Sequence, residues 1–253
     1  MILDHGAMRF PLPNGPRSRI TAVFAHPDDE AFFAGATLAG YAAAGCDLHL
    51  ATLTGGEAIG PAQLRNYAQA ARLLGAAEAR QLRPGRWQDL GRAGAPRSPA
   101  AAPLTDIVTA IEEFLREVRP DVLITTDGDG VTGHPDHRRA QEAVLAARGP
   151  VPVVLASCVR GADVRAATSR LSALAPNATI GSGGIRGVEF DPLEIEPTAT
   201  AIQSRAAALD TYYPGLGSRP LSELVDLAGP VGDGLVLRAV AEAAQHREYF
   251  REV

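Results

Sequence analysis

Two short stretches of this sequence place histidine and aspartate side chains where they could hold a metal ion. The first, His26-Pro27-Asp28-Asp29-Glu30, comes just after the apolar run 20–24. His26 and Asp29 are three residues apart, so one helical turn places an imidazole and a carboxylate on the same side, as a divalent metal requires. The alternative is ordinary helix-start chemistry, because proline suits the first helical position and acids favour the positive end of the helix dipole. Capping explains the acids but not the histidine.

The second stretch, His134-Pro135-Asp136-His137, comes after the apolar run 121–126 and a loop rich in glycine and aspartate. Each stretch therefore lies between a predicted strand and a predicted helix, and the two helices are expected at residues 31–44 and 138–147. In a sheet of parallel strands such loops open at the carboxyl edge, where ligands bind. We therefore expect the strand at 20–25 to neighbour the strand at 121–126, so that the two stretches meet.

A metal bound between the two stretches would be held by two histidines and one carboxylate. This is the ligand set of an open catalytic zinc site, in which the fourth position is left for water. Asp29 is the expected carboxylate ligand because it lies three residues from His26. Asp28 points about a quarter-turn away on a helix, and it is the candidate general base because such a site needs one carboxylate that does not bind the metal.

The two motifs together are similar to those of the PIG-L/LmbE-like N-deacetylases, which hydrolyse the acetamide of N-acetylglucosamine-type sugars with zinc. The resemblance implies that zinc, or another divalent metal, is bound by His26, Asp29 and His137. It leaves His134 to stabilise the tetrahedral oxyanion and to act as an acid. Asp136 would not bind the metal itself but would orient one of the histidines.

The resemblance runs from about residue 20 to residue 209 and suggests two contacts with the sugar. The turn TLTGGEAIG resembles the family's Thr-x-Gly-Glu-like turn, so Glu57 is a candidate for binding sugar hydroxyls; the alternative is a plain loop carboxylate. Arg65 matches the arginine of the family's Arg-x-x-Glu and is a candidate substrate contact. Ala68 stands where the family has the acid, which puts the local polar arrangement in doubt.

Residues 83–103 are rich in glycine, proline and arginine and are expected to form a long loop, which in a compact domain is more often functional than idle. The family usually has an Asp-Gly turn in this region, whereas this chain has Trp87 and Asp89. Both are candidates for the substrate rim. Trp87 could stack on a sugar face, but packing of the loop onto the body explains it equally well.

The remaining periodicity predicts an α/β fold with a Rossmann-like, mostly parallel sheet flanked by helices and an active site at the carboxyl edge of the strands. Further strands are expected at 47–54, 78–82, 151–157 and 188–190, and further helices at 61–74, 104–118, 197–209 and 235–250. Residues 1–19 are expected to be an irregular lead-in, 159–187 show no clear periodicity, and the glycines at 181–184 indicate a flexible loop. We expect a single domain, 1–253, whose part 158–253 varies within the family.

Composition limits the possible partners. The chain has 253 residues, a net charge of −5 and a pI near 5.7, and its basic residues form no dense run, so we expect no nucleic-acid partner. No apolar run approaches the roughly 18 residues that span a membrane, and no secretion signal is recognisable. Cys46 and Cys158 are expected to be reduced, buried thiols of a cytoplasmic protein. A homo-oligomer is compatible with these features.

These observations favour a zinc-dependent hydrolase that removes the N-acetyl group from an N-acetylglucosamine-type aminosugar in a small-molecule conjugate, such as one made in thiol or secondary-metabolite biosynthesis. A second hypothesis is an amidase that cleaves a larger acyl group or a thiol conjugate. A third, of another class, is a non-catalytic Rossmann-like binding domain. That domain would be expected to have lost a ligand, but His26, Asp29, His137 and the base Asp28 are all present.

Overall fold

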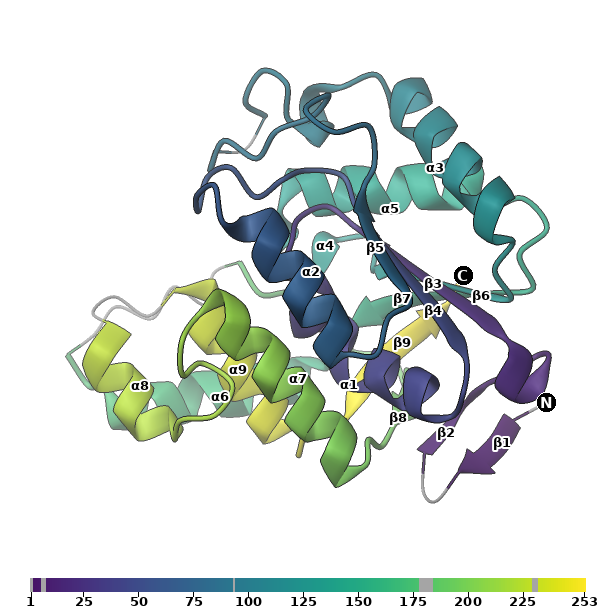
Figure 1. Cartoon of the computed structure of the whole chain (residues 1–253). Helices are drawn as coiled ribbons and strands as arrows, with labels where there is room; N and C mark the ends of the chain where they lie inside the picture. Colours follow the sequence, from purple (N-terminus) through teal and green to yellow (C-terminus); the bar gives the residue numbers. More distant parts are fainter. Residues whose placement is uncertain (1, 6–7, 93, 178–183, 229–231) are drawn as a thin grey trace.

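A seven-stranded sheet forms the centre of the protein (Figure 1). The computed structural model describes residues 2–5, 8–92, 94–177, 184–228 and 232–253. In spatial order the strands are β5-β4-β3-β6-β7-β9-β8; the first five are parallel, and β9 is antiparallel to both of its neighbours. Their bounds are β3 Arg19–Phe24, β4 Asp47–Thr52, β5 Glu78–Gln81, β6 Val122–Thr126, β7 Val153–Cys158, β8 Leu193–Ile195 and β9 Glu248–Glu252. This confirms the predicted α/β fold with a mostly parallel sheet.

The two strands that precede the histidine motifs are neighbours in the sheet, as predicted. Ile20 of β3 pairs with Val122 of β6. From β3 the chain continues to β4 and β5 on one side, and it returns to build β6 and β7 on the other. The order of strands therefore reverses between β3 and β6, and a crevice opens outside the carboxyl ends of the strands at such a point.

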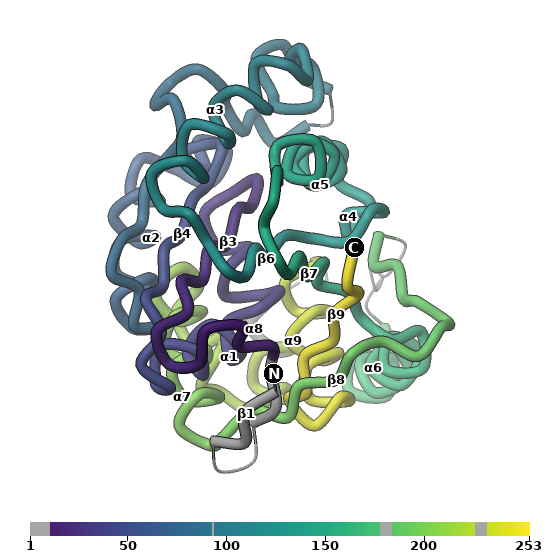
Figure 2. Tube along the Cα trace, turned by 90° about the vertical axis from the view of Figure 1, so that its right-hand side faces the viewer, coloured from purple at the N-terminus to yellow at the C-terminus, as the bar shows by residue number. Residues whose placement is uncertain are grey.

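Helices cover both faces of the sheet because successive strand residues point to opposite sides. Ile20 and Phe24 pack with the helices of one face, α1, α2, α6, α7, α8 and α9, whereas Val23 packs with α3 and α5 on the other. Figure 1 shows these two layers, and Figure 2 shows them from a view turned by 90°. The helix bounds are α1 Asp29–Ala43, α2 Gln63–Leu73, α3 Leu104–Val118, α4 Gly130–Gly133, α5 Pro135–Ala147, α6 Gly161–Leu174, α7 Ala199–Tyr212, α8 Leu221–Ala228 and α9 Asp233–Ala243, with short 3-10 turns η1 Gly15–Arg17 and η2 Pro99–Ala101.

Three predictions about secondary structure were wrong. The expected irregular lead-in contains an antiparallel hairpin, β1 Ile2–His5 and β2 Met8–Pro11. The helix expected at 235–250 ends at Ala243, and the positive φ angles of Gln245 (54°) and His246 (63°) lead the chain into β9. The strand expected at 188–190 is only a single bridge between Val188 and Arg160, and β8 begins five residues later.

One helix was missed altogether. The sequence has no clear periodicity at 159–187, yet α6 occupies half of this segment. The buried positions of α6 include only Gly161, Ala167 and Leu171, so two of the three are small and leave a weak apolar stripe. The loop predicted at 181–184 lies largely outside the described residues.

Two other expectations concern the chain as a whole. Cys46 and Cys158 are both free and buried, as predicted. Among the helices that the structure describes, none is both long and apolar enough to cross a membrane. The single-domain organisation and the cytoplasmic location stay predictions.

The last strand and α7 both hold helix α1 from the side. The buried Glu248 carboxylate of β9 accepts hydrogen bonds from the backbone N–H groups of Ala36 at 2.9 Å and Thr37 at 2.7 Å, both in the middle of α1. The buried Arg205 of α7 donates to the carbonyl of Ala31 at 3.1 Å, and it lies 3.6 Å from Glu248. The helix that carries the first motif is therefore fixed by residues more than 170 positions away along the chain.

Candidate metal centre and active site

His26 and Asp29 lie where β3 turns into α1, at the carboxyl edge of the sheet. The backbone N–H of His26 donates to Oδ2 of Asp29 at 2.9 Å. Asp28 is the N-cap residue of α1, but its side chain makes no capping hydrogen bond, and its φ is 106°. A non-glycine residue in such a conformation costs about 1–3 kcal/mol, and such strain clusters at functional sites. Helix capping therefore does not account for the carboxylate of Asp28.

The second motif brings His137 to the same place. Nε2 of His137 lies 3.1 Å from Nδ1 of His26 and 3.2 Å from Oδ1 of Asp29, and His26 Nδ1 lies 3.7 Å from Asp29 Oδ2. Ligand atoms around a tetrahedral zinc ion with bonds of about 2.0–2.2 Å lie about 3.3–3.6 Å apart. All three side chains are buried. They could therefore hold a metal ion with little movement.

Neighbouring groups determine which nitrogen of each histidine faces this point. His137 Nδ1 lies 3.0 Å from the carbonyl of Gly130, which can only accept, so Nδ1 carries the proton and Nε2 presents a lone pair. His26 Nε2 lies 3.4 Å from Oδ2 of Asp136, so His26 presents its Nδ1 lone pair. The other oxygen of Asp136 accepts the N–H of Ala100 at 2.8 Å. Asp136 thus contacts the ring nitrogen of His26 that is not offered to a metal, an arrangement typical of histidines that bind metal ions.

Three lone-pair groups that face one another repel unless a cation lies between them. A proton can meet this need: burial lowers the pKa of His137, but the adjacent Asp29 carboxylate outweighs this and raises that pKa to about 9. A divalent cation would displace the proton, because histidine binds metals in its neutral form. The chemistry of these ligand atoms therefore fits a metal ion.

His134 lies beside this cluster, but one of its ring nitrogens already accepts a hydrogen bond. It is the N-cap residue of α5, and its Nδ1 accepts the N–H of Asp136 at 3.2 Å. Nε2 of neutral His134 then carries the proton and can only donate. The candidate ligand atoms of His26, His134 and His137 all lie within 4.8 Å of one another, so distance alone leaves His134 as a possible ligand. Because its one lone pair is already used, the geometry favours Asp29 as the third ligand.

Residues 21–148, half of the chain, match the family model described as PIG-L: GlcNAc-PI de-N-acetylase. The matched span contains both histidine motifs. The chain belongs to the PIG-L family. The predicted family resemblance is thereby confirmed.

Several known proteins resemble this chain in sequence, and several solved structures resemble it in fold. A 1D-myo-inositol 2-acetamido-2-deoxy-alpha-D-glucopyranoside deacetylase of Catenulispora acidiphila is 40% identical over 156 residues, which are 51% of this chain and 44% of that protein. The chain spans about half the length of the curated relatives it matches. The A40926 pseudoaglycone deacetylase Dbv21 shares the fold with a TM-score of 0.61 at 18% identity, over 92% of this chain and 96% of that one. The 4-carboxy-2-hydroxymuconate hydratase GalB of Pseudomonas putida also shares it, with a TM-score of 0.54 at 14% identity, over 93% and 96%.

Sequence analysis of this PIG-L protein missed two tyrosines that hold the acids of the first motif. The hydroxyl of Tyr213 donates to Oδ2 of Asp28 at 2.6 Å, and the hydroxyl of Tyr212 donates to Oε1 of Glu30 at 2.7 Å. Burial and the charge of Asp29 raise the pKa of Asp28 well above its ordinary value, and burial raises that of Glu30 to about 7. The available signal in the sequence was a pair of adjacent tyrosines shortly after the predicted helix 197–209.

The polar rim of the site is only partly as predicted. Oε2 of Glu57 accepts the N–H of Asp89 at 2.9 Å, so the turn after β4 is joined to the long loop after β5. The Glu57 side chain is exposed, and Asp89 is half-buried. Arg65 lies exposed on α2, and within the described part of the chain its guanidinium forms no hydrogen bond or ion pair. Contact of these three residues with substrate stays a prediction.

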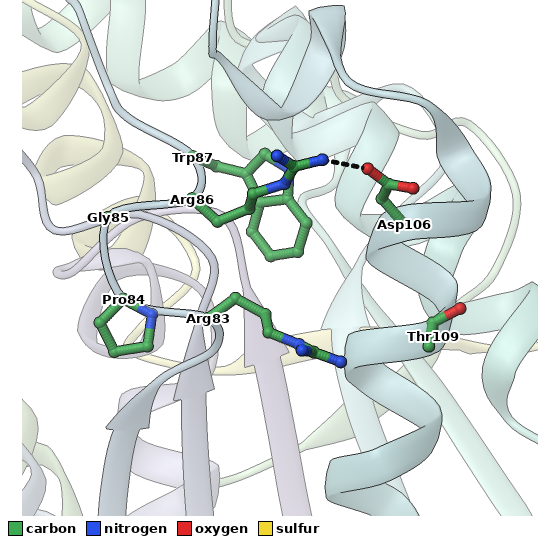
Figure 3. A pocket seen from close by; sticks show the side chains of 7 residues that line it. All are labelled: Arg83, Pro84, Gly85, Arg86, Trp87, Asp106 and Thr109. Carbon is green, nitrogen blue, oxygen red and sulfur yellow. Dashed lines mark hydrogen bonds and ion pairs between the residues drawn. The ribbon is translucent and has the colours of Figure 1, made fainter.

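Trp87 does not lie on this rim. It is only 2% exposed and packs in the core under α3 and α5, together with Val23 and Phe114, so the packing alternative describes it. A hollow of about 670 Å³ lies outside it, between the 83–87 segment and α3. Figure 3 shows Arg86 ion-paired with Asp106 across this hollow. No residue of the histidine motifs lines it, so it is separate from the candidate metal centre.

Replacing Glu57 by alanine should loosen the long loop where it meets the rim. We expect KM to rise about five- to tenfold, which corresponds to the loss of about one hydrogen bond, while the bound metal is unchanged. Steady-state kinetics on the substrate and metal analysis of the purified variant provide the measurements. Glu189→Ala, which removes an exposed glutamate paired with Arg165, serves as the control. Unchanged KM in Glu57→Ala would place substrate recognition elsewhere.

Proposed function

We propose that this protein is a zinc-dependent hydrolase that removes the N-acetyl group from an N-acetylglucosamine-type aminosugar in a small-molecule conjugate. The observation that carries this proposal is the convergence of His26 Nδ1, His137 Nε2 and the Asp29 carboxylate within 3.7 Å of one another, with Asp28 left outside the ligand set. The relatives named as deacetylases of an N-acetylglucosaminyl inositol support the substrate class.

We assign His26, Asp29 and His137 as the ligands of the metal. A zinc ion held there supplies a water of lowered pKa, from about 15.7 to about 7, and polarises the amide carbonyl. No nucleic acid or membrane is needed for this reaction, and we expect the substrate to be a free small molecule.

Asp28 is the proposed general base. It takes one proton from the water that attacks the acetamide carbon, a role typically worth ~10²–10⁴-fold in rate. Its burial favours this role because a raised pKa makes the carboxylate a stronger base. The same proton then passes to the nitrogen as the C–N bond breaks, so the products are acetate and the free amine of the sugar.

His134 is the proposed stabiliser of the oxyanion. Because its Nδ1 accepts the N–H of Asp136, its Nε2 carries the proton and is available as a donor. Removing one such donor typically costs about 10²–10³-fold in kcat. Asp136 would hold His26 in the orientation that a metal ligand needs, through the 3.4 Å contact between its Oδ2 and His26 Nε2.

Two other functions make different predictions. A non-catalytic binding domain would not need Asp28 in a strained backbone conformation beside converging ligand atoms, with a side chain that makes no capping hydrogen bond. An amidase for larger acyl groups would use the same residues, so it differs only in the space around the acyl group. The hydratase among the structures of the same fold illustrates that the fold alone does not choose the reaction.

Replacing any single ligand, in His26→Ala, Asp29→Ala or His137→Ala, should lower the bound metal sharply. Each variant removes one of only three protein ligands. Metal content after dialysis against limiting chelator is the measurement, and Glu189→Ala is the control. If a variant kept full metal occupancy, the residue replaced in it would not be a metal ligand.

The substrate class is tested by offering the wild-type protein a panel of N-acetylglucosaminides together with matched longer N-acyl analogues. We expect release of acetate and of a free amine from the acetylated members, abolished by chelation and restored by zinc. Faster cleavage of the longer acyl analogues would favour the amidase. A protein that binds no metal and cleaves nothing would favour the binding domain.

A further inference from the structure

Tyr213 is placed to control the carboxylate of Asp28. Its hydroxyl lies 2.6 Å from Oδ2, which makes this a short, charge-assisted hydrogen bond. In the part of the chain that the structure describes, no other hydrogen bond reaches the Asp28 carboxylate. Oδ1 of Asp28 therefore remains free to accept a proton.

The ring of Tyr213 is itself held in place. Tyr213 is the C-cap residue of α7, and its N–H donates to the carbonyl of Leu209 at 2.9 Å. Its ring lies 6.0 Å from that of Phe32, measured between centroids, in a tilted arrangement. Phe32 belongs to the first turn of α1, so the tyrosine and the motif that it contacts share one packed unit.

The backbone of Asp28 is fixed separately from its carboxylate. Its N–H donates to Oε2 of Glu30 at 3.0 Å, and Tyr212 holds the other oxygen of Glu30. This pair helps to keep Asp28 at its strained φ of 106°. With the backbone fixed in this way, only rotation of the side chain remains, and Tyr213 is the group that opposes it.

We propose that Tyr213 is a positioning residue for the general base: its hydroxyl binds Oδ2 of Asp28 and so directs Oδ1 toward the attacking water. This inference rests on the proposed function. It gives the C-cap residue of α7 a part in the reaction, although this helix lies outside the matched family span of 21–148. A base that rotates freely would spend much of its time in unproductive orientations.

The kinetic test compares Tyr213→Phe with the wild-type protein. We expect kcat to fall about tenfold or more while KM and metal content stay near wild type, because the lost hydrogen bond orients a base and binds neither substrate nor metal. Tyr249→Phe is the matched control, since it removes the hydroxyl of a buried tyrosine in a separate small cluster with Cys158 and Ala244. Its kcat should remain that of the wild type.

A second test needs no activity. Unfolding by urea is measured with chelator present for the wild type, Tyr213→Phe, Asp28→Ala and the double variant. If the contact exists in solution, the effect of Tyr213→Phe on the unfolding equilibrium constant should be at least about threefold larger when Asp28 is present than when it is alanine.

The two tests separate this inference from the proposed function. Additive unfolding effects together with wild-type kcat in Tyr213→Phe would overturn the positioning role and leave the deacetylase intact. A raised KM with unchanged kcat would also overturn it, because Tyr213 would then bind substrate. Coupled unfolding in a protein that cleaves no N-acetylglucosaminide would support the contact and overturn the proposed function.

Discussion

Asp28→Asn is expected to keep its metal and to lose about 10²-fold or more in kcat. Asparagine has nearly the same size as aspartate and still accepts the hydrogen bond of Tyr213, but its amide cannot take a proton. Substrate binding should therefore be close to that of the wild type. Metal analysis, KM and kcat measured on the same preparation test the three parts of this expectation.

The dependence on pH gives a second readout for the same variant. Activity of the wild type should fall as the pH falls through the pKa of its base, since only the carboxylate form accepts a proton. Asp28→Asn should lack this acidic limb at its residual rate. If the limb persisted unchanged, the base would be another residue, and His134 would be the next candidate.

Asp29→Asn is the control that separates the base from the ligand. The two acids are adjacent in the sequence, but only Asp29 lies within 3.7 Å of the facing nitrogens of both His26 and His137. We expect Asp29→Asn to lose metal as well as activity. The reverse pattern, with metal lost in Asp28→Asn and kept in Asp29→Asn, would exchange the two roles.

Glu248→Ala is expected to destabilise the fold by about 3–5 kcal/mol, the usual cost of removing one partner from a buried charged pair. The change would leave Arg205 without its carboxylate and the N–H groups of Ala36 and Thr37 without this acceptor. These contacts hold α1 against α7 and β9. The free energy of unfolding from urea titration is the measurement.

Two variants of the same strand set the scale for this loss. Glu248→Gln keeps a carbonyl acceptor for one of the two N–H groups and should cost less than Glu248→Ala. Glu252→Ala removes an exposed side chain from β9 and should change the unfolding free energy by less than about 0.5 kcal/mol. Equal effects in Glu248→Ala and Glu252→Ala would show that the buried network contributes nothing.

The sequence by itself determined the centre of this site. A short apolar run, a histidine and an acid-rich helix start are local features, and their spacing fixes how the strand, the loop and the helix follow one another. Because two such units in a parallel sheet open at one edge, the meeting of His26 with His137 could be predicted. The helix 104–118 was predicted to the residue, since its apolar stripe repeats with the helical period.

The supporting contacts were decided only by the tertiary structure. Tyr213 reaches Asp28 from 185 residues away, and Glu248 reaches Ala36 from 212 residues away. Neither pair shares a local pattern, so no periodicity could reveal it. The approach of Arg205 also depends on Gly35, where a Cβ atom would lie 2.9 Å from the arginine side chain. The glycine is visible in the sequence, but the side chain that needs the space is not.

The same reason explains why the two alternatives at Trp87 stayed open and why β9 was predicted as a helix. An aromatic residue in a polar loop suits either a sugar platform or a core position, and the choice depends on what packs beneath the loop. Residues 248–252 formed a strand because β7 presented a free edge to pair with. Local sequence sets the preferred period of a segment, whereas the partner that satisfies its hydrogen bonds and buries its side chains is supplied by the rest of the fold.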